Sequence, residues 1–289
     1  MEGLWTKQKE IEFFTESLKN FAEPEQLFYV ADDGYYYAYW PKSYKGKKTT
    51  LQSRNALIGQ FTEKYSVNLV QQFVQDKGLF AVQGVICKEI GLTPQSPADV
   101  GICKSKQREQ KPEDILAIFE VKMSIVWNWK LVKGKLLCLG DYRTHQGTPG
   151  LLRSDSMLKA IGKSINIRVS GYRATKIPII ILGNTPITSS YYSKVDHLCK
   201  AGIIQGFWSI NPNPLDNNEE NIKSTQDKGF TRFDSYEELD NSLERLFEEG
   251  REFFSSMKTK EELGRIIEIA NQEPTYKLKA EKFLALLKE

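Results

Sequence analysis

Two acidic residues and a lysine stand at the ends of two apolar segments of the sequence. Asp99 lies at the edge of the first segment, and Glu120 and Lys122 end the second, which covers residues 115–122. Side chains alternate between the faces of a strand, so Glu120 and Lys122 point to one side and Val121 to the other. If the two strands are neighbours, two carboxylates and an ammonium meet. Carboxylates hold Mg²⁺, and a lysine beside them can activate water or steady a phosphate, which is the chemistry of metal-dependent phosphodiester hydrolysis.

This spacing resembles the catalytic motif of the PD-(D/E)xK nucleases. The proline departs slightly from the pattern, because Pro97 precedes Ala98 rather than Asp99. A Glu-x-Lys triplet is common as a surface pair in a chain that is 27% charged. Here, however, the fully apolar residues 116–119 come directly before it, which places it where a buried strand emerges.

The resemblance implies a role for each residue of the motif. Asp99, Glu120 and the carbonyl of Val121 would bind Mg²⁺, and Lys122 would orient or activate the attacking water. Many restriction-type members carry a further acid on the helix before the sheet, and Glu63 is the candidate for it. An exposed Glu63 paired with a neighbouring lysine is equally consistent with the sequence.

Hydrophobic periodicity predicts the elements that must position these residues. Along the chain they are a helix over 51–76, strands over 80–87, 100–104 and 115–127, a helix over 156–169, a strand over 177–182, a helix over 191–201 and a strand over 203–210. The strand over 177–182 is apolar throughout, as in a buried parallel strand, and 136–139 is expected to extend the same sheet. This α/β order matches the restriction-endonuclease-like αβββαβ core, a mixed sheet flanked by helices, and the resemblance covers about residues 51–214.

Three regions are expected along the chain. Residues 1–50 would form a helix over 7–21 and a β-hairpin whose aromatic residues either pack or stack on bases. Residues 51–215 would form the nuclease core, and 216–289 an acidic helical region. This last region carries an apolar stripe at helical spacing, which either packs on the core or forms a dimer interface. The stripe consists of Leu239, Leu243, Leu246, Phe247, Phe253 and Phe254.

The charge of the chain is small in total but unevenly spread. The formal net charge is +3, yet residues 216–252 hold twelve acids and five bases, and residues 142–176 hold seven bases and one acid. A basic face of this kind is typical of polyanion binding, although a charged run is also an ordinary solvated surface. The candidate DNA-contacting residues are Arg143, His145, Gln146, Thr148 and Arg153 in the glycine-containing loop 142–155, Lys159 and Lys163 on the outer side of the next helix, and Lys45, Lys47 and Lys48.

Other chemistries find little support. The chain has two histidines, no P-loop and no GxSxG elbow, and its four cysteines form no CxxC pair, so they are expected to be buried thiols. No apolar run is long enough for a membrane span and no signal-peptide pattern is present, so a cytoplasmic protein without a membrane partner is expected.

We therefore expect a Mg²⁺-dependent, sequence-specific endonuclease that cuts double-stranded DNA and is similar to type II restriction enzymes. Two-fold DNA sites favour a homodimer. Two alternatives remain open. One is a structure-specific recombination or repair nuclease of the same fold, and the other is a DNA-binding module whose nuclease site has decayed.

Overall fold

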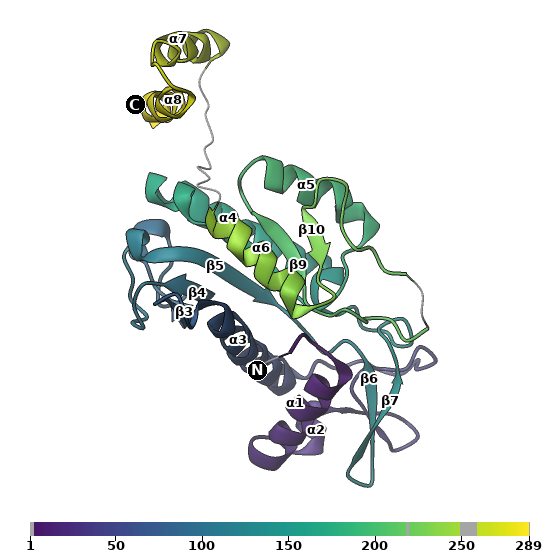
Figure 1. Ribbon diagram of the computed structural model, residues 1–289. Helices are drawn as coiled ribbons and strands as arrows, with labels where there is room; N and C mark the ends of the chain where they lie inside the picture. Colours follow the sequence, from purple (N-terminus) through teal and green to yellow (C-terminus); the bar gives the residue numbers. More distant parts are fainter. Residues whose placement is uncertain (1–2, 218–219, 249–258, 289) are drawn as a thin grey trace. The chain divides into compact units, whose positions relative to one another are not determined.

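The computed structural model describes residues 3–217, 220–248 and 259–288 (Figure 1). The chain divides into two compact units, one up to residue 251 and one from residue 252 onward. The first unit holds every strand of the described chain, and the second is a pair of helices.

A six-stranded sheet with the order β10-β9-β8-β5-β4-β3 forms the centre of the first unit. Its strands are β3 Phe80–Val85, β4 Ala98–Cys103, β5 Ile115–Lys122, β8 Ile179–Gly183, β9 Gly206–Ser209 and β10 Phe230–Arg232. The strand β4 runs antiparallel to both of its neighbours, whereas β5, β8, β9 and β10 run parallel. Every residue of β8 is buried, so the prediction of a buried parallel strand is confirmed.

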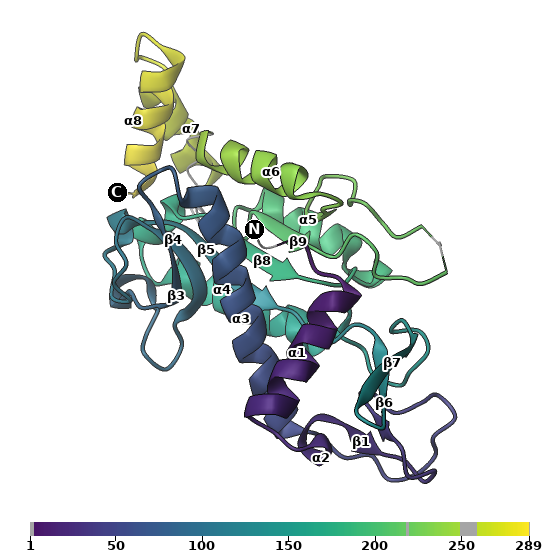
Figure 2. The same cartoon turned by 60° about the horizontal axis from the view of Figure 1, so that its bottom comes forward.

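Helices cover both faces of this sheet. Within β8, Ile180 and Leu182 pack into one core and Ile179 and Ile181 into the other, as strand alternation requires. The first core is closed by α1 (Lys7–Asn20), α3 (Gln52–Val74) and α6 (Tyr236–Glu248), and the second by α4 (Ser154–Val169) and α5 (Tyr192–Lys200). Figure 2 shows α3 crossing one face of the sheet. The predicted class, a mixed α/β sheet flanked by helices, is confirmed at this level.

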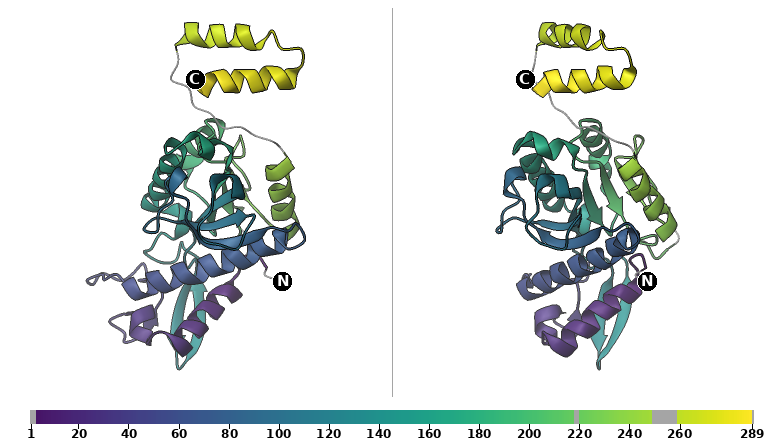
Figure 3. Two further views of the ribbon diagram at one scale, coloured as in Figure 1. Left: turned by 90° about the vertical axis from the view of Figure 1, so that its left-hand side faces the viewer. Right: turned by 60° about the vertical axis from the view of Figure 1, so that its left-hand side comes forward.

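A second, four-stranded antiparallel sheet corrects one prediction. It has the order β1-β2-β6-β7, with β1 Tyr29–Val30, β2 Tyr36–Tyr37, β6 Asn128–Val132 and β7 Lys135–Gly140. The predicted strand over 115–127 therefore ends at Lys122, and residues 136–139 do not extend the main sheet. Figure 3 shows the β6–β7 hairpin beside α1.

The reason for the break lies on α1. The backbone N–H groups of Val126 and Trp127 donate to the carboxylate of Glu10, the latter at 3.2 Å, instead of to a strand partner. The indoles of Trp5 and Trp129 donate to the same carboxylate, at 3.2 and 2.7 Å. Glu10 is fully buried and thus holds the chain at the point where it passes from one sheet to the other.

The acidic C-terminal region does not form a separate part from residue 216. Its β10 joins the main sheet, and Leu239, Leu243 and Leu246 of α6 are buried in the first core, so this part of the stripe packs on the core. Phe253 and Phe254 lie outside the described residues. The second unit contains α7 (Lys260–Ala270) and α8 (Tyr276–Lys288).

Several short helical segments connect the longer elements. The short helical segments are α2 Pro24–Leu27, η1 Lys88–Ile90, η2 Pro112–Asp114, η3 Gly150–Leu152, η4 Tyr172–Lys176 and η5 Ser189–Tyr191. The four cysteines are free thiols. Cys87 and Cys103 are buried, as expected, whereas Cys199 is half-buried and Cys138 is exposed, so the prediction of buried thiols was wrong for these two. In the described parts of the chain, no helix has the length and apolar character needed to cross a bilayer.

Candidate active site

The antiparallel pairing of β4 and β5 brings the predicted carboxylates together. Val100 lies opposite Phe119, so one step further along each strand places Asp99 beside Glu120. The backbone N–H of Val121 donates to Asp99 Oδ2 at 2.7 Å, which fixes the orientation of that carboxylate. The Glu120 side chain is buried, and that of Asp99 is 18% exposed, so the pair lies at the edge of the core.

Lys122 completes the predicted group of three. Its Nζ lies 2.7 Å from Glu120 Oε1 and 3.6 Å from Asp99 Oδ2, so one ammonium bridges both carboxylates. The same Nζ donates to the Val121 carbonyl at 3.1 Å, which places that oxygen at the site as well. The structure therefore brings Asp99, Glu120, Val121 and Lys122 together as the sequence predicted.

A second lysine, Lys163 of α4, also reaches the site, and here the prediction was wrong. We expected Lys163 to lie beside Lys159 on the outer side of the helix. Lys159 is indeed 76% exposed, but the Lys163 side chain is only 18% exposed. Its Nζ lies 2.6 Å from Glu120 Oε2 and 3.4 Å from Asp99 Oδ1. The packing of α4 against β5, which one-dimensional periodicity does not show, turns this residue inward.

Glu63 lies on α3, which covers the face of the sheet opposite to α4, and among the described residues it does not join Asp99 and Glu120 in a group that could hold a metal. It accepts a hydrogen bond of 2.9 Å from Gln83 Nε2 on β3 rather than pairing with a lysine. Partial burial raises the pKa of Glu63, the Gln83 hydrogen bond opposes this rise, and repulsion from the Asp99 carboxylate adds to it. Gln83 was not singled out from the sequence, because a polar residue in a strand carries no distinct signal.

The electrostatics follow from burial and crowding. Burial raises the pKa of Glu120, and the charge of Asp99 raises it further, while the two lysines pull in the opposite direction. Burial tends to lower the pKa of Lys163, but the attraction of Glu120 and Asp99 outweighs it, so the pKa is raised. The site is thus a compact set of opposite charges at a partly dry position, where each interaction is strengthened by the low local dielectric.

The donor atoms here suit a hard divalent cation. Two carboxylates and one backbone carbonyl are all oxygen ligands, which Mg²⁺ prefers, and Mg²⁺ commonly keeps several waters besides one or two carboxylates. Lys163 Nζ already places a positive charge between Asp99 and Glu120, so the two acids are close enough to share a cation. Within the described residues, no group of three or more His, Cys, Asp and Glu side chains is arranged to hold a metal, so this site would depend on water and substrate oxygens.

A buried amide network holds the chain just after Lys122. Asn184 Oδ1 accepts from the Ser124 N–H at 3.1 Å, and its Nδ2 donates to the Ser124 carbonyl at 2.7 Å. Gly150 has a φ of +53°, and a Cβ there would lie 3.2 Å from the Lys122 carbonyl oxygen. The loop 142–155 therefore passes directly against the end of β5 at Gly150, where only glycine fits without strain.

Two of the residues proposed to read bases have packing roles instead. His145 is 4% exposed and stacks flat on Tyr39, with ring centroids 3.9 Å apart. Gln146 Nε2 donates to the carbonyls of Pro41, Lys42 and Tyr44, at 2.8, 3.2 and 2.6 Å. These side chains tie the loop 142–155 to residues 39–44, which come just before the basic loop 45–48, so they are not free to enter a groove.

The remaining candidate DNA contacts lie at or near the surface. Arg143 pairs with Asp141 at 2.9 Å and Arg153 with Asp155 at 2.5 Å, so both guanidiniums have an intramolecular acid. Thr148, Lys45, Lys47, Lys48 and Lys159 are exposed. The aromatic residues of the N-terminal region stack on one another, Tyr29 on Trp40 and Trp40 on Tyr44, which favours packing for the inner rings.

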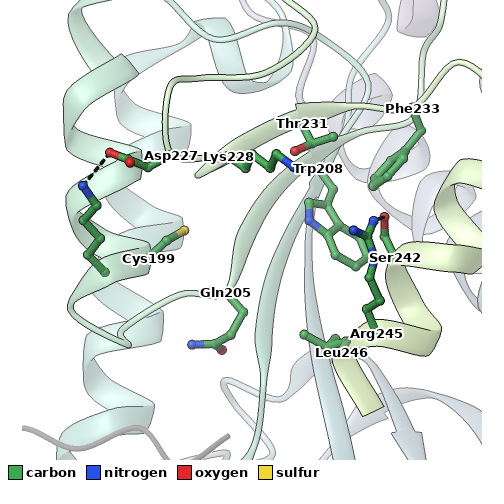
Figure 4. A pocket seen from close by; sticks show the side chains of 11 residues that line it. Cys199, Gln205, Trp208, Asp227, Lys228, Thr231, Phe233, Ser242, Arg245 and Leu246 are labelled. Atoms are coloured by element: carbon green, nitrogen blue, oxygen red, sulfur yellow. Dashed lines mark hydrogen bonds and ion pairs between the residues drawn. The ribbon is translucent and has the colours of Figure 1, made fainter. Parts of the chain in front are cut away.

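A separate open cavity of about 460 Å³ lies between α5, α6, β9 and β10. Cys199, Trp208 and Arg245 are among the side chains around it (Figure 4). Lys200 and Asp227 at its rim pair with each other at 2.6 Å. Among the described residues, its lining shares none with the carboxylate site.

Comparisons of the chain with models of protein families, with curated proteins and with solved structures found no match. The function must therefore be inferred from the chemistry of the site itself.

Proposed function

We propose that this protein is a Mg²⁺-dependent DNA endonuclease of the PD-(D/E)xK type that hydrolyses phosphodiester bonds. The observation that carries the proposal is the position of one ammonium, Lys122 Nζ, within 3.6 Å of the carboxylates of both Asp99 and Glu120. Residues from two different strands thus converge at one point in the order and with the chemistry that the motif requires.

The arrangement of elements supports the same proposal. Among the main-sheet strands and the helices that flank them, the order α3, β3, β4, β5, α4, β8 is the αβββαβ order that the resemblance implies, with the β6–β7 hairpin of the second sheet inserted between β5 and α4. The site lies where β4 begins and β5 ends, and Asp99, Lys122 and Lys163 each keep 18% of the side chain exposed, so solvent and substrate oxygens can reach them. A polymer with exposed phosphates fits such a site better than a small molecule, which is usually enclosed.

Each side chain then has a defined task. Asp99, Glu120 and the Val121 carbonyl would hold Mg²⁺, which, when bound, neutralises charge on the scissile phosphate and on the leaving oxygen. Lys122, held by both carboxylates, would orient the attacking water and take up negative charge that develops nearby. The hydrogen bond from the Val121 N–H keeps Asp99 in place, and Glu63 would act from α3 as an auxiliary acid.

For the substrate, we propose double-stranded DNA cut at specific sites by a homodimer, as in type II restriction enzymes. The exposed lysines of the loop 45–48 precede α3, and Gln146 and His145 fix the segment in front of them to the loop that reaches the catalytic strand. Phosphate contacts by this loop would therefore be rigidly linked to the site of cleavage.

The proposal is tested by incubating the purified protein with supercoiled plasmid and with a long natural DNA, in Mg²⁺ and in EDTA. We expect cutting in Mg²⁺ alone and a discrete set of fragments from the long DNA. Preferential cutting of a four-way junction over linear duplex would favour a structure-specific nuclease. DNA binding without any cleavage would indicate a decayed site and would overturn the catalytic proposal.

A further inference from the structure

Lys163 is the residue of the site that the three-residue motif does not require. Lys122 Nζ faces Glu120 Oε1 and Asp99 Oδ2, whereas Lys163 Nζ faces the other oxygen of each carboxylate, Glu120 Oε2 and Asp99 Oδ1. The two ammoniums therefore divide the four oxygens between them. Since Asp99 Oδ2 is also taken by the Val121 N–H, the oxygens that face Lys163 are those best placed for a metal ion.

We infer that Lys163 is a tethered counter-ion that occupies the cation position between Asp99 and Glu120 and is displaced when a divalent cation binds there. This inference rests on the proposed metal-dependent function. A divalent cation and an ammonium cannot both lie between the same two oxygens, because their charges repel at this distance. Metal binding must therefore move the Lys163 ammonium. Until a metal binds, this ammonium neutralises the carboxylates of Asp99 and Glu120.

The side chain is able to make this movement without a change in the fold. Lysine carries its charge on a flexible four-carbon stem, so its head can turn away while the backbone stays in place. The helix α4 is anchored by other residues, because Met157, Ala160 and Ile167 are buried in the second core. An ammonium displaced from the carboxylates remains beside the metal site, where it can contact a phosphate of the substrate.

Metal affinity, measured without DNA, tests the inference on the full-length protein. Binding of Mn²⁺, followed by its electron paramagnetic resonance signal, is compared for the wild type, Lys163→Met and Lys159→Met. Lys159 is the matched control, since it lies one turn earlier on α4 and is exposed. Removing the competing charge should tighten Mn²⁺ binding about tenfold or more in Lys163→Met and leave Lys159→Met unchanged. Lys163→Arg keeps the charge and should not tighten binding.

Equal or weaker Mn²⁺ binding by Lys163→Met would overturn the inference while leaving the proposed function standing. If neither the wild type nor any variant binds Mn²⁺, the metal-dependent function fails together with it.

A second measurement uses the wild-type protein, so it tests the inference even if Lys163→Met does not fold. Reductive methylation of the wild type, read by mass spectrometry, reports whether each lysine amine is accessible. Methylation of Lys163 should be slow in EDTA and several-fold faster in Mg²⁺, whereas that of Lys159 should be the same in both. An equal rate for Lys163 in the two conditions would show that its ammonium is not displaced.

Discussion

Several residues around the site are held in charge states that their surroundings dictate. Glu120 lies near the end of the buried strand β5, where two lysines partly offset the burial and the Asp99 charge that raise its pKa. His145 shows the opposite case. Burial lowers its pKa to about 4, and its neutral ring accepts the Gly147 N–H on Nδ1 at 3.0 Å while stacking on Tyr39. Protonation of Nδ1 would break that hydrogen bond.

His145 predicts a pH dependence of stability. Its folded pKa of about 4 lies below the ordinary 6.5, so between these values the unfolded chain binds the extra proton. The free energy of unfolding should therefore rise with pH across this window, by at most roughly 3 kcal/mol from this residue, and the contribution is lost as the pH falls to about 4. Urea unfolding at several pH values measures it. The free energy of unfolding of His145→Gln should depend less on pH than that of the wild type, whereas the exposed-site variant His197→Gln should behave like the wild type. The same pH dependence in the wild type and both variants would contradict the assignment.

One buried acid, Glu10, joins the helix α1 to the second sheet. Glu10 of α1 accepts from two indoles and from two backbone N–H groups that precede β6, so it connects the helix to the second sheet. Burial raises the pKa of Glu10 to about 8, although all four donors favour its ionised form. Above that pH, the carboxylate is a charged acceptor with matched donors.

Glu10→Gln should destabilise the protein strongly. The amide group of glutamine would point N–H groups at N–H donors, and hydrogen bonds to a charged acceptor are worth about 1.5–3 kcal/mol each. We expect the free energy of unfolding at pH 9 to fall by about 3 kcal/mol, measured by urea unfolding. Glu16→Gln, an exposed residue on the same helix, should change it by less than about 0.5 kcal/mol. A Glu10→Gln protein as stable as the wild type would show that the four contacts do not hold the hairpin.

Most elements of the main sheet could be predicted from sequence patterns alone. The strands β3, β4, β5, β8 and β9 and the helices α3, α4 and α5 follow from local periodicity, whereas β10 lies in a region that was expected to be helical. Asp99, Glu120 and Lys122 follow because strand alternation is short-range. The end of β5 at Lys122 does not follow, because the partner that ends it, Glu10, lies more than a hundred residues away. The inward position of Lys163 likewise depends on how α4 packs, and the pattern alone favoured the solvent side.

At the scale of the whole molecule, charge is separated along the chain. Residues 216–252 are acidic, and the remaining residues carry a net charge of +10. Because Lys163 is engaged with the carboxylates, the exposed lysines 45, 47 and 48 and Lys159 are the stronger candidates for phosphate contacts. Such contacts release counterions from DNA and make binding depend on salt.

The salt dependence of DNA binding tests this distribution. Each phosphate contact contributes about −0.9 to the slope of log affinity against log salt concentration. Replacing Lys45, Lys47 and Lys48 by alanine should therefore flatten the slope by about 2 to 3, as measured by fluorescence anisotropy in Ca²⁺. The matched control replaces three exposed lysines of the first unit that lie beside β9 and β10, namely Lys194, Lys200 and Lys228, and should leave the slope unchanged. An unchanged slope for the first variant would place the basic loop away from DNA.

The most direct test of the central claim is the rate at which Lys122→Ala cleaves plasmid DNA under single-turnover conditions in Mg²⁺. If Asp99, Glu120 and Lys122 form a hydrolytic centre, the rate should fall by about 10²–10⁴ relative to the wild type. DNA affinity should be retained, and the control Lys19→Ala, at an exposed position on α1, should cut normally. Circular dichroism confirms that the variant is folded. Cleavage by folded Lys122→Ala at a rate close to that of the wild type would contradict the account.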